Sequence, residues 1–373
     1  MLYATHARIH LGNIRENLLA IRRAVGPHRK ILIAVKANAY GHGAVEVSRM
    51  AEDAGIDWLG VATVPEGLQL REAGIRLPIL KLGPTFPEEM EAAIRGHITL
   101  AMCSRDNAEA LEAAALRAGV EAVVHLKLDT GMGRIGVPPA EAPALAAFLE
   151  RECPHVRLEG IFTHLPVSDA ADTAFTKAQI VRFKEAVEAV EASVGRSLLA
   201  HCANSGAVLG HEEAWLGLVR PGIMIYGFYP DAETPRSIPL LPGLSFLTRV
   251  SFLKRVVAGT SIGYGRTWIA PQDTWIATIP AGYADGFNRL FSNKGRVLIG
   301  GKSHPVVGRI CMDQSMVDLG PETDVKVGDE VVLIGRSGDQ EITVDEWAEQ
   351  LGTITYEVTC QINARVERVY DTD

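Results

Sequence analysis

Lys36 has the placement in this chain that most directly suggests chemistry. It follows an apolar run, Ile31–Val35, and precedes a polar loop with two glycines, Ala37–Gly43. A lysine at the mouth of a buried strand is desolvated, which favours its neutral amine, a nucleophile that forms Schiff bases with aldehydes. An ordinary surface lysine after a strand fits the same residues, so the rest of the chain has to decide between the two interpretations.

Polar side chains also follow four other apolar runs. They are Lys127 to Arg134, His164, Asn204 with Ser205, and Arg220 to Ile223. Each has a structural explanation when taken alone: His164 as a hydrogen-bonded core imidazole, Arg134 as a loop ion pair, Ser205 as a helix N-cap. In a β/α barrel, however, reactive groups lie at the carboxyl ends of the strands, so their shared location favours a common site.

Two of these segments resemble the phosphate site that barrels build after their seventh and eighth strands. Ser205 is placed to start a short helix, and Gly222 and Ile223 offer backbone N–H groups. A phosphate site beside a nucleophilic lysine fits pyridoxal phosphate, which also needs a partner for its pyridine nitrogen. Arg220 is a candidate partner, and because arginine only donates, it would leave that nitrogen unprotonated and the ring a weaker electron sink.

The C-terminal third carries a second set of glycine-flanked tyrosines and polar residues. It includes Tyr264 within Gly263–Arg266, Tyr283 within Ala281–Gly286, the pair Met312 and Asp313, and Tyr356. A tyrosine beside glycine is common in β-turns, where its ring packs on the neighbouring strand. Tyr264 alone therefore fits a structural role as well as a functional one, and the set carries more weight than its members.

The elements that must position these residues change in kind along the chain. From about Ala7 to Tyr226, short apolar strands alternate with helical patterns such as Phe175–Val190, which predicts parallel β/α units. There are eight strand candidates, a number that fits a closed barrel: Ile31–Val35, Trp58–Val61, Ile79–Leu82, Ile98–Met102, Val123–Leu128, Leu158–Thr163, Leu198–His201 and Met224–Tyr226.

After Pro242 the helical pattern fades and strands dominate. Gly300–Gly301 reads as a hairpin turn, and the one clear helix, Thr343 to Leu351, opens with a capping-box pattern. We therefore predict an α/β fold class: an N-terminal (β/α)8 TIM-type barrel over residues 1–240, followed by a mostly-β domain over residues 241–373.

Composition narrows the range of functions. The formal net charge of −8 supplies no basic field for nucleic acid or an anionic membrane. The first residues lack the pattern of a signal peptide, and no apolar stretch reaches membrane-spanning length, which favours the cytoplasm. The five cysteines are scattered without a C-x-x-C pair, so we expect neither a disulfide framework nor a metal site.

Five segments taken together resemble bacterial alanine racemases, in the same order and over nearly the whole chain. They are Ala34–Gly43, Leu128–Arg134, Arg220–Ile223, Gly263–Gly265 and Met312–Gln314. The resemblance implies a fold-type III enzyme that uses pyridoxal 5'-phosphate to interconvert L-alanine and D-alanine, supplying D-alanine for the cell wall peptidoglycan. It also implies a homodimer in which one subunit's barrel and the other's β domain share each active site.

The resemblance also assigns roles by position. Lys36 would bind the cofactor and act as the base for D-alanine, and Tyr264 of the partner subunit would serve L-alanine, with His164 and Arg220 hydrogen-bonded in sequence behind it. Tyr283 would narrow the entrance, Arg134 would orient an oxygen of the ligand, and Lys127 matches a position often carbamylated in relatives. Cofactor binding would further involve Tyr40, Asn204, Ser205, Gly222, Ile223 and Tyr356, and substrate binding Met312 and Asp313.

Two alternative enzymes remain open. A fold-type III amino acid decarboxylase shares the barrel and the lysine, but normally pairs the pyridine nitrogen with an acidic residue, and Arg220 argues against it. A broader alanine/serine racemase is the other, because Pro166, near the expected mouth of the site, stands where relatives more often have alanine. A cofactor carrier built from a single barrel would lack the second domain.

Overall fold

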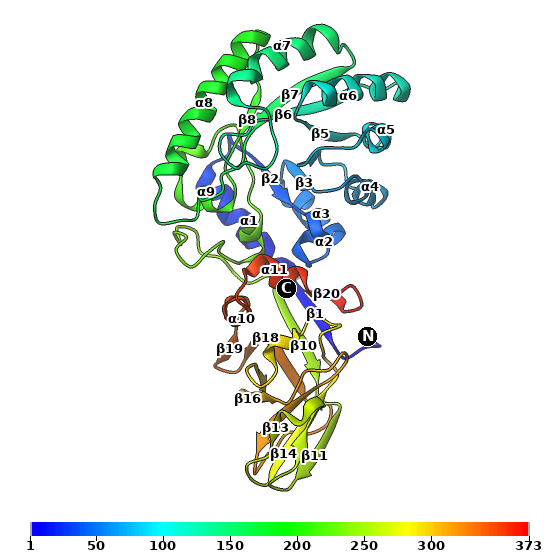
Figure 1. Ribbon diagram of the computed structural model, residues 1–373, viewed down its shortest axis with the longest axis vertical. Helices are drawn as coiled ribbons and strands as arrows, with labels where there is room; N and C mark the ends of the chain where they lie inside the picture. The colour runs from blue at the N-terminus through cyan, green and yellow to red at the C-terminus, as the bar shows by residue number, and fades with distance from the viewer. Residues whose placement is uncertain (1, 372–373) are drawn as a thin grey trace. The chain divides into compact units, whose positions relative to one another are not determined.

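A parallel sheet of eight strands curls into a nearly closed barrel between residues 15 and 241 (Figure 1). The computed structural model describes residues 2–371. The chain divides into two compact units: Arg15–Leu241, here called the barrel domain, and the segments up to Ile14 and from Pro242, together called the β domain. The predicted class, a β/α barrel followed by a mostly-β domain, is confirmed.

Strands and helices alternate through the barrel domain. The strands are β2 (Lys30–Ala34), β3 (Trp58–Val61), β4 (Ile79–Lys81), β5 (Ile98–Met102), β6 (Ala122–Lys127), β7 (Val156–Phe162), β8 (Leu199–His201) and β9 (Leu218–Val219). The helices are α1 (Leu11–Val25), α2 (Lys36–Tyr40), α3 (Ala44–Asp53), α4 (Val64–Glu72), α5 (Pro87–Arg95), α6 (Arg105–Ala118), α7 (Ala142–Glu152), α8 (Ala174–Val194) and α9 (Ser205–Gly210). Helices α4 to α8 lie outside the strands (Figure 1).

The barrel strands run in the order β8-β7-β6-β5-β4-β3-β2-β9. Beside β8 and β9, Gly217 N–H donates to Ala200 O over 3.2 Å and Arg220 N–H to Ala203 O over 2.8 Å, which brings the two ends of the sheet together. Parallel strands buried on both faces read as continuous apolar runs, and the first seven strand candidates overlap β2 to β8 for this reason.

The eighth predicted strand, Met224–Tyr226, is wrong. These residues form a short 3-10 helix, η3 (Ile223–Tyr226), and the strand that completes the barrel is the two-residue β9. All four residues of η3 are buried. A short buried apolar run gives no periodicity that separates strand from helix, and Pro221–Gly222 ends the extended segment before the run begins.

The β domain is built on a ten-stranded sheet. Its central path runs β11-β14-β17-β16-β15-β18-β10-β1-β20, and β19 pairs with β18. The strands are β1 (His6–His10), β10 (Leu244–Arg249), β11 (Phe252–Val256), β14 (Thr274–Ile279), β15 (Arg296–Ile299), β16 (Lys302–Val307), β17 (Ser315–Gly320), β18 (Glu330–Ser337), β19 (Gln340–Ile342) and β20 (Glu367–Asp371). The predicted turn at Gly300–Gly301 joins β15 and β16, and both glycines have positive φ.

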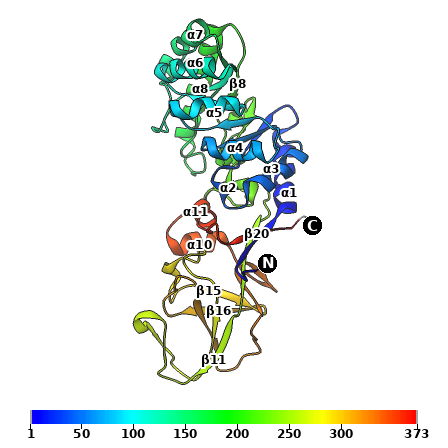
Figure 2. The ribbon, with the colours of Figure 1, turned by 90° about the vertical axis from the view of Figure 1, so that its right-hand side faces the viewer.

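The first strand of the chain belongs to this second sheet. β1 pairs in parallel with β20 and antiparallel with β10, and Figure 2 shows the dark blue N-terminal segment beside β20. The predicted division at residue 240 lies next to the observed one, but the observed β domain also takes the segment up to Ile14. Pairing between strands so far apart in sequence leaves no local signal.

Two helices cover part of the β domain. α10 (Val344–Leu351) is the helix predicted from its capping pattern, and the Thr343 side chain accepts from Glu346 N–H as expected. A second helix, α11 (Thr355–Cys360), was not predicted. Its six residues, Thr-Tyr-Glu-Val-Thr-Cys, are rich in β-branched and aromatic types, which favour strands.

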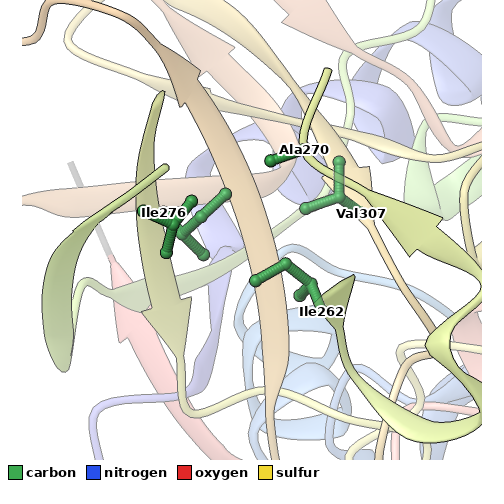
Figure 3. Close-up of a cluster of buried hydrophobic side chains, with 5 residues drawn as sticks. Ile262, Ala270, Ile276 and Val307 are labelled. Atoms are coloured by element: carbon green, nitrogen blue, oxygen red, sulfur yellow. The ribbon is translucent and has the colours of Figure 1, made fainter. Parts of the chain in front are cut away.

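A small hydrophobic cluster supports the turn that carries Tyr264. Strands β12 (Ser261–Ile262) and β13 (Trp268–Ile269) pair around that turn, which contains the short helix η4 (Tyr264–Arg266). Figure 3 shows Ile262 packed in a cluster with Ala270, Ile276 and Val307, to which Val256 also belongs. The base of the turn is therefore buried while its tip projects from the domain.

Within residues 2–371, no helix combines the length and the apolar character that crossing a membrane requires. The same residues contain no cluster of three or more histidine, cysteine or acidic side chains arranged to hold a metal ion.

Candidate active site

Lys36 stands where the buried strand β2 gives way to an unusual turn. The strand residues Ile31–Ala34 are buried, and Lys36 itself is half-buried. The next four residues, Ala37 to Tyr40, all have φ between 51° and 56°, so the backbone makes a left-handed helical turn. An L-residue in that conformation costs roughly 1–2 kcal/mol, and such strain persists only where the surroundings impose it.

Side chains on both flanks hold the left-handed turn. Glu66 accepts from Ala37 N–H over 2.7 Å, and Asn38 accepts from Ala44 N–H over 2.9 Å. Inside the turn, Gly41 N–H donates to Ala37 O over 3.0 Å. These hydrogen bonds offset the backbone strain and fix the direction in which the chain leaves β2. The Lys36 Nζ lies 5.9 Å from the centre of the Tyr40 ring.

Tyr40 belongs to a buried aromatic group beneath this turn. Its ring centre lies 5.2 Å from that of Tyr226, and His42 stacks on Tyr226 at 4.4 Å. The Tyr226 hydroxyl donates to Ala34 O over 2.8 Å, tying the group to the end of β2. Tyr226 comes from η3, so the helix that replaces the predicted strand also positions Tyr40.

Tyr40, Ser205 and Gly222 converge from three separate segments. Gly222 N–H donates to the Ser205 hydroxyl over 2.8 Å. A Cβ atom at position 222 would lie 3.0 Å from the Tyr40 hydroxyl, so the close approach favours glycine there. The Tyr40 and Ser205 hydroxyls thus meet at a glycine whose N–H orients the Ser205 hydroxyl, and together they form a cradle suited to a phosphate group. Ile223, fully buried, follows at once.

Asn204, rather than Ser205, caps the short helix α9. The Asn204 side chain accepts from Ala207 N–H over 3.1 Å and from the Ser168 hydroxyl over 2.6 Å, and it donates to Leu165 O over 2.9 Å. The N-cap explanation therefore does not apply to Ser205. Its hydroxyl is left to join α9 to Gly222.

Arg220, directly after β9, is buried with 6% of its surface exposed. Its guanidinium donates to His201 Nδ1 over 2.8 Å, to Thr163 O over 2.7 Å and to Cys202 O over 3.2 Å. Burial lowers the pKa of Arg220 to about 10, so the group remains protonated at neutral pH. No carboxylate in the described part of the chain bonds it.

His164 and Lys127 lie in the field of this guanidinium. Burial, followed by the charges of Arg220 and Arg134, lowers the pKa of His164 to about 3 and so keeps its imidazole neutral. Burial and Arg220 also lower the pKa of Lys127, 2% exposed at the end of β6, to about 8. The Lys127 ammonium donates to Leu128 O over 2.5 Å. The hydrogen-bonded neighbour of Arg220 in this structure is His201, not His164.

Arg134 lies on the exposed loop that follows β6. Asp129 shapes this loop by accepting from the N–H groups of Gly131 and Gly133, each over 3.0 Å. These hydrogen bonds hold the pKa of Asp129 below its usual value although partial burial opposes them. The carboxylate is therefore a structural part of the loop.

The candidate residues of the β domain lie on loops and are mostly exposed. Tyr264 exposes 72% of its surface, Met312 53% and Tyr283 43%. Tyr283 N–H donates to Cys311 O over 3.1 Å, which places the Tyr283 loop against the Met312 loop. Gly282 permits this contact, because a Cβ there would lie 2.4 Å from the carbonyl oxygens of Cys311 and Met312.

Asp313 and Tyr356 complete the predicted set in the β domain. Asp313 bonds Arg365 over 2.8 Å, and the same guanidinium bonds the fully buried Asp285 over 2.8 Å. Tyr356 lies half-buried in α11. The structure thus groups Tyr283, Met312 and Asp313 on neighbouring loops and places Tyr264 on its own turn.

Several residues that shape these sites were not singled out from the sequence. Glu66, Asn38, Tyr226, His201 and Arg365 all hold a candidate side chain or its backbone in place. No local sequence pattern marks these residues, because only the fold brings each of them near its partner. His201 ends the strand candidate Leu198–His201, and its bond to Arg220 is what distinguishes it from a core histidine.

The chain matches two family models that together span most of its length. Residues 9–230 match the alanine racemase N-terminal domain, and residues 244–370 match the alanine racemase C-terminal domain. An alanine racemase of Cutibacterium acnes is 52% identical over 98% of this chain and 97% of its own.

Solved structures of alanine racemases also superpose on this chain. One from Clostridium difficile 630 has a TM-score of 0.95 and 39% identity, covering 100% of this chain and 97% of its own. Another, from Bacillus anthracis with bound L-Ala-P, has a TM-score of 0.94 and 35% identity, covering 100% and 96%.

Proposed function

This chain belongs to the alanine racemase family, and we propose that it interconverts L-alanine and D-alanine with pyridoxal 5'-phosphate. The match of both domains over nearly the whole chain carries this conclusion. The site geometry supports it, because Lys36 leaves its strand beside Tyr40, and Tyr40 meets Ser205 and Gly222 at a cradle suited to phosphate.

The residues of the barrel domain fit this cofactor. Lys36 would bond its aldehyde, and Arg220 would face its pyridine nitrogen. Its phosphate would be held by Tyr40, Ser205, Gly222 and Ile223, and by Tyr356 as the family resemblance implies. Asn204 and His164 would also contact the cofactor. When bound, the cofactor supplies the electron sink that makes the substrate's Cα–H bond acidic. The protein must then hold, deliver and remove the proton.

Racemisation needs a proton acceptor on each face of the substrate carbon, and we assign these roles to Lys36 and Tyr264. From D-alanine, the Lys36 amine would take the proton while a proton is delivered to the opposite face. In the reverse direction, Lys36 would deliver a proton to its own face. The Tyr264 hydroxyl would serve the face of L-alanine. Its exposure at the tip of a turn suits a residue that reaches into the site of a partner subunit, and we therefore also propose a homodimer.

Arg220 favours racemisation over the alternative chemistry, decarboxylation. Its three hydrogen-bond acceptors are an imidazole and two carbonyl oxygens, so it remains a fixed cation and a donor only. A donor facing the pyridine nitrogen leaves that nitrogen unprotonated and limits the electron sink, which suits brief proton removal and return. A decarboxylase would benefit from an acidic group here.

The remaining assignments concern the substrate. We propose that Arg134 orients an oxygen of the ligand, that Met312 offers its backbone N–H to the substrate carboxylate with Asp313 beside it, and that Tyr283 narrows the entrance. Lys127 is a candidate for carbamylation, because a pKa of about 8 leaves part of its amine neutral. The broader alanine/serine racemase stays open on account of Pro166. Supply of D-alanine for peptidoglycan in the cytoplasm stays a prediction.

A panel assay tests this function directly. Purified protein should be yellow and should racemise alanine in both directions, with other amino acids, serine included, as competitors. Lys36→Ala should lose both the colour and the activity. Lys81→Met is a control, because Lys81 is a second lysine at the end of a barrel strand, bonded to Pro84 O. Its loss should leave the colour. Release of CO2 without racemisation would instead support the decarboxylase.

A further inference from the structure

A series of hydrogen bonds, here called the proton chain, connects Arg220 to the carboxylate of Glu159. Arg220 donates to His201 Nδ1 over 2.8 Å, His201 Nε2 lies 2.8 Å from His125 Nδ1, and His125 Nε2 lies 3.3 Å from Glu159 Oε2. Both histidines are fully buried, whereas the Glu159 side chain is 27% exposed. His125, Glu159 and His201 lie on the neighbouring strands β6, β7 and β8, which Figure 1 labels.

Arg220 determines which ring nitrogen of each histidine carries the proton. A guanidinium only donates, so His201 Nδ1 must accept and His201 must carry its proton on Nε2. That proton points to His125 Nδ1, which must accept in turn, so His125 carries its own proton on Nε2 and donates it to Glu159. A charged ring at either position would place two donors face to face and break the chain.

The surroundings agree with two neutral rings and an ionised carboxylate. Burial lowers the pKa of both histidines. The pKa of His201 falls well below the usual histidine value. The hydrogen bond from His125 and the charge of Arg157 lower the pKa of Glu159 although partial burial opposes them. His201 also stacks on Phe162, with ring centres 5.0 Å apart and planes 5° from parallel.

The backbone is irregular at the point where the chain reaches Glu159. Val124 pairs with Leu158, but the next residue, His125, pairs with Gly160, so Glu159 is an extra residue in a β-bulge. A bulge redirects a side chain that regular pairing would place elsewhere. Gly160 makes room for the ring, because a Cβ there would lie 2.8 Å from His125 Cε1 and Nδ1.

We propose that Glu159 is a positioning residue for Arg220, acting through His125 and His201. The carboxylate attracts the His125 proton, which polarises both rings and strengthens His201 Nδ1 as the acceptor for the guanidinium. Arg220 thereby receives the influence of a remote negative charge without a carboxylate at its own nitrogens. The functional part of this inference rests on the proposed role of Arg220 opposite the pyridine nitrogen.

The proton positions give a test that needs no turnover. In holoenzyme labelled with ¹⁵N-histidine, His125 and His201 should both be neutral between pH 6 and 8, each with its proton on Nε2. Spectra of variants in which His125 or His201 is replaced assign the signals to the two rings. A proton on Nδ1 of either ring, or a doubly protonated ring, would overturn the proposal whether or not the protein racemises alanine.

The functional arm compares two carboxylates that both bond Arg157. Glu159→Gln keeps an acceptor for His125 but removes the charge, and should lower kcat on the order of fivefold, with KM nearly unchanged, since a charged acceptor exceeds a neutral one by roughly that factor. Glu121→Gln is the matched control, because Glu121 bonds Arg157 over 3.0 Å and lies outside the chain to Arg220, and it should leave kcat unchanged.

A double variant tests whether the effect of Glu159 on kcat depends on the His125 ring. In a His125→Leu background, Glu159→Gln should lower kcat no further, because the link to Arg220 is already broken. Equal kcat values for Glu159→Gln, Glu121→Gln and the parent would refute the proposal while leaving the racemase function intact. A parent that binds no cofactor and racemises nothing would refute the proposed function, with the ¹⁵N result still deciding the proton chain.

Discussion

Four cationic side chains dominate the barrel-domain site at the scale of single residues. Arg220, Arg134, Lys127 and Lys36 all contribute to the lowered pKa of His164, after burial. A concentration of positive charge beside buried groups favours ligands that carry anionic groups, such as a phosphate and a carboxylate. The same field disfavours protonation of neighbouring bases, which keeps His164 neutral and Lys127 partly so.

Lys127 should therefore take up CO2 as a carbamate. Only the neutral amine reacts, and its pKa of about 8 is below the usual lysine value. At a fixed low concentration of dissolved CO2, occupancy should fall as pH decreases below 8, because protonation removes the reactive amine. A carbamate signal in ¹³C NMR after addition of ¹³C-bicarbonate measures this, and it should persist in Lys81→Arg and vanish in Lys127→Arg. Persistence in Lys127→Arg would assign the signal elsewhere.

The left-handed turn after Lys36 is the decisive element. Ala37, Asn38, Ala39 and Tyr40 share a conformation that L-residues seldom adopt in succession. Ala37 and Asn38 are exposed, so no core packing of their side chains explains it. The turn directs Tyr40 into the barrel domain beneath Lys36 and next to Gly222, and we interpret the strain as the cost of that placement.

Glycine substitutions in two different elements test this strain. Ala37→Gly should raise the free energy of unfolding by up to about 1 kcal/mol, because relief of roughly 1–2 kcal/mol exceeds the entropic cost of glycine. Ala113→Gly, at an exposed position in the right-handed helix α6, should lower it by about 0.5–1 kcal/mol. Denaturant unfolding curves measure both, and a loss of stability in Ala37→Gly would contradict the strain.

The proposed site combines two sets of residues at the scale of the whole molecule. Lys36, Tyr40, Ser205 and Arg220 lie in the barrel domain, whereas Tyr264, Tyr283 and Met312 lie on exposed loops of the β domain. If Tyr264 is the second base, as proposed, its exposed side chain must reach a substrate carbon held beside Lys36. The proposed homodimer provides it in the barrel domain of the partner subunit, and this arrangement makes a quantitative prediction.

Mixing two inactive variants should restore activity if the sites are shared between subunits. Lys36→Ala and Tyr264→Phe homodimers should each be nearly inactive. After subunit exchange, half of the dimers would be mixed and one of the two sites in each would be intact, giving about a quarter of the parent activity. The control is a chain that carries both substitutions, exchanged with Lys36→Ala, which should stay inactive. Mixed dimers without activity would place both bases within one subunit.

The sequence predicted the general architecture because its signals are local. Buried parallel strands such as Trp58–Val61 read as apolar runs, and the helix at Val344 begins with a capping threonine. The family resemblance rests on short segments around Lys36, Arg134 and Arg220, which the chain itself contains. Strand ends also indicated the candidate residues of the barrel domain, since a barrel brings the carboxyl ends of its strands to one rim.

Tertiary structure alone decided the features that depend on distant partners. It joined β1 to β10 and β20, and it made residues 223–226 a helix whose Tyr226 supports Tyr40. It also forced four non-glycine residues after Lys36 into a left-handed turn and connected Arg220 to Glu159 through two histidines. These outcomes depend on contacts between segments far apart in sequence, which local patterns of residue type do not encode.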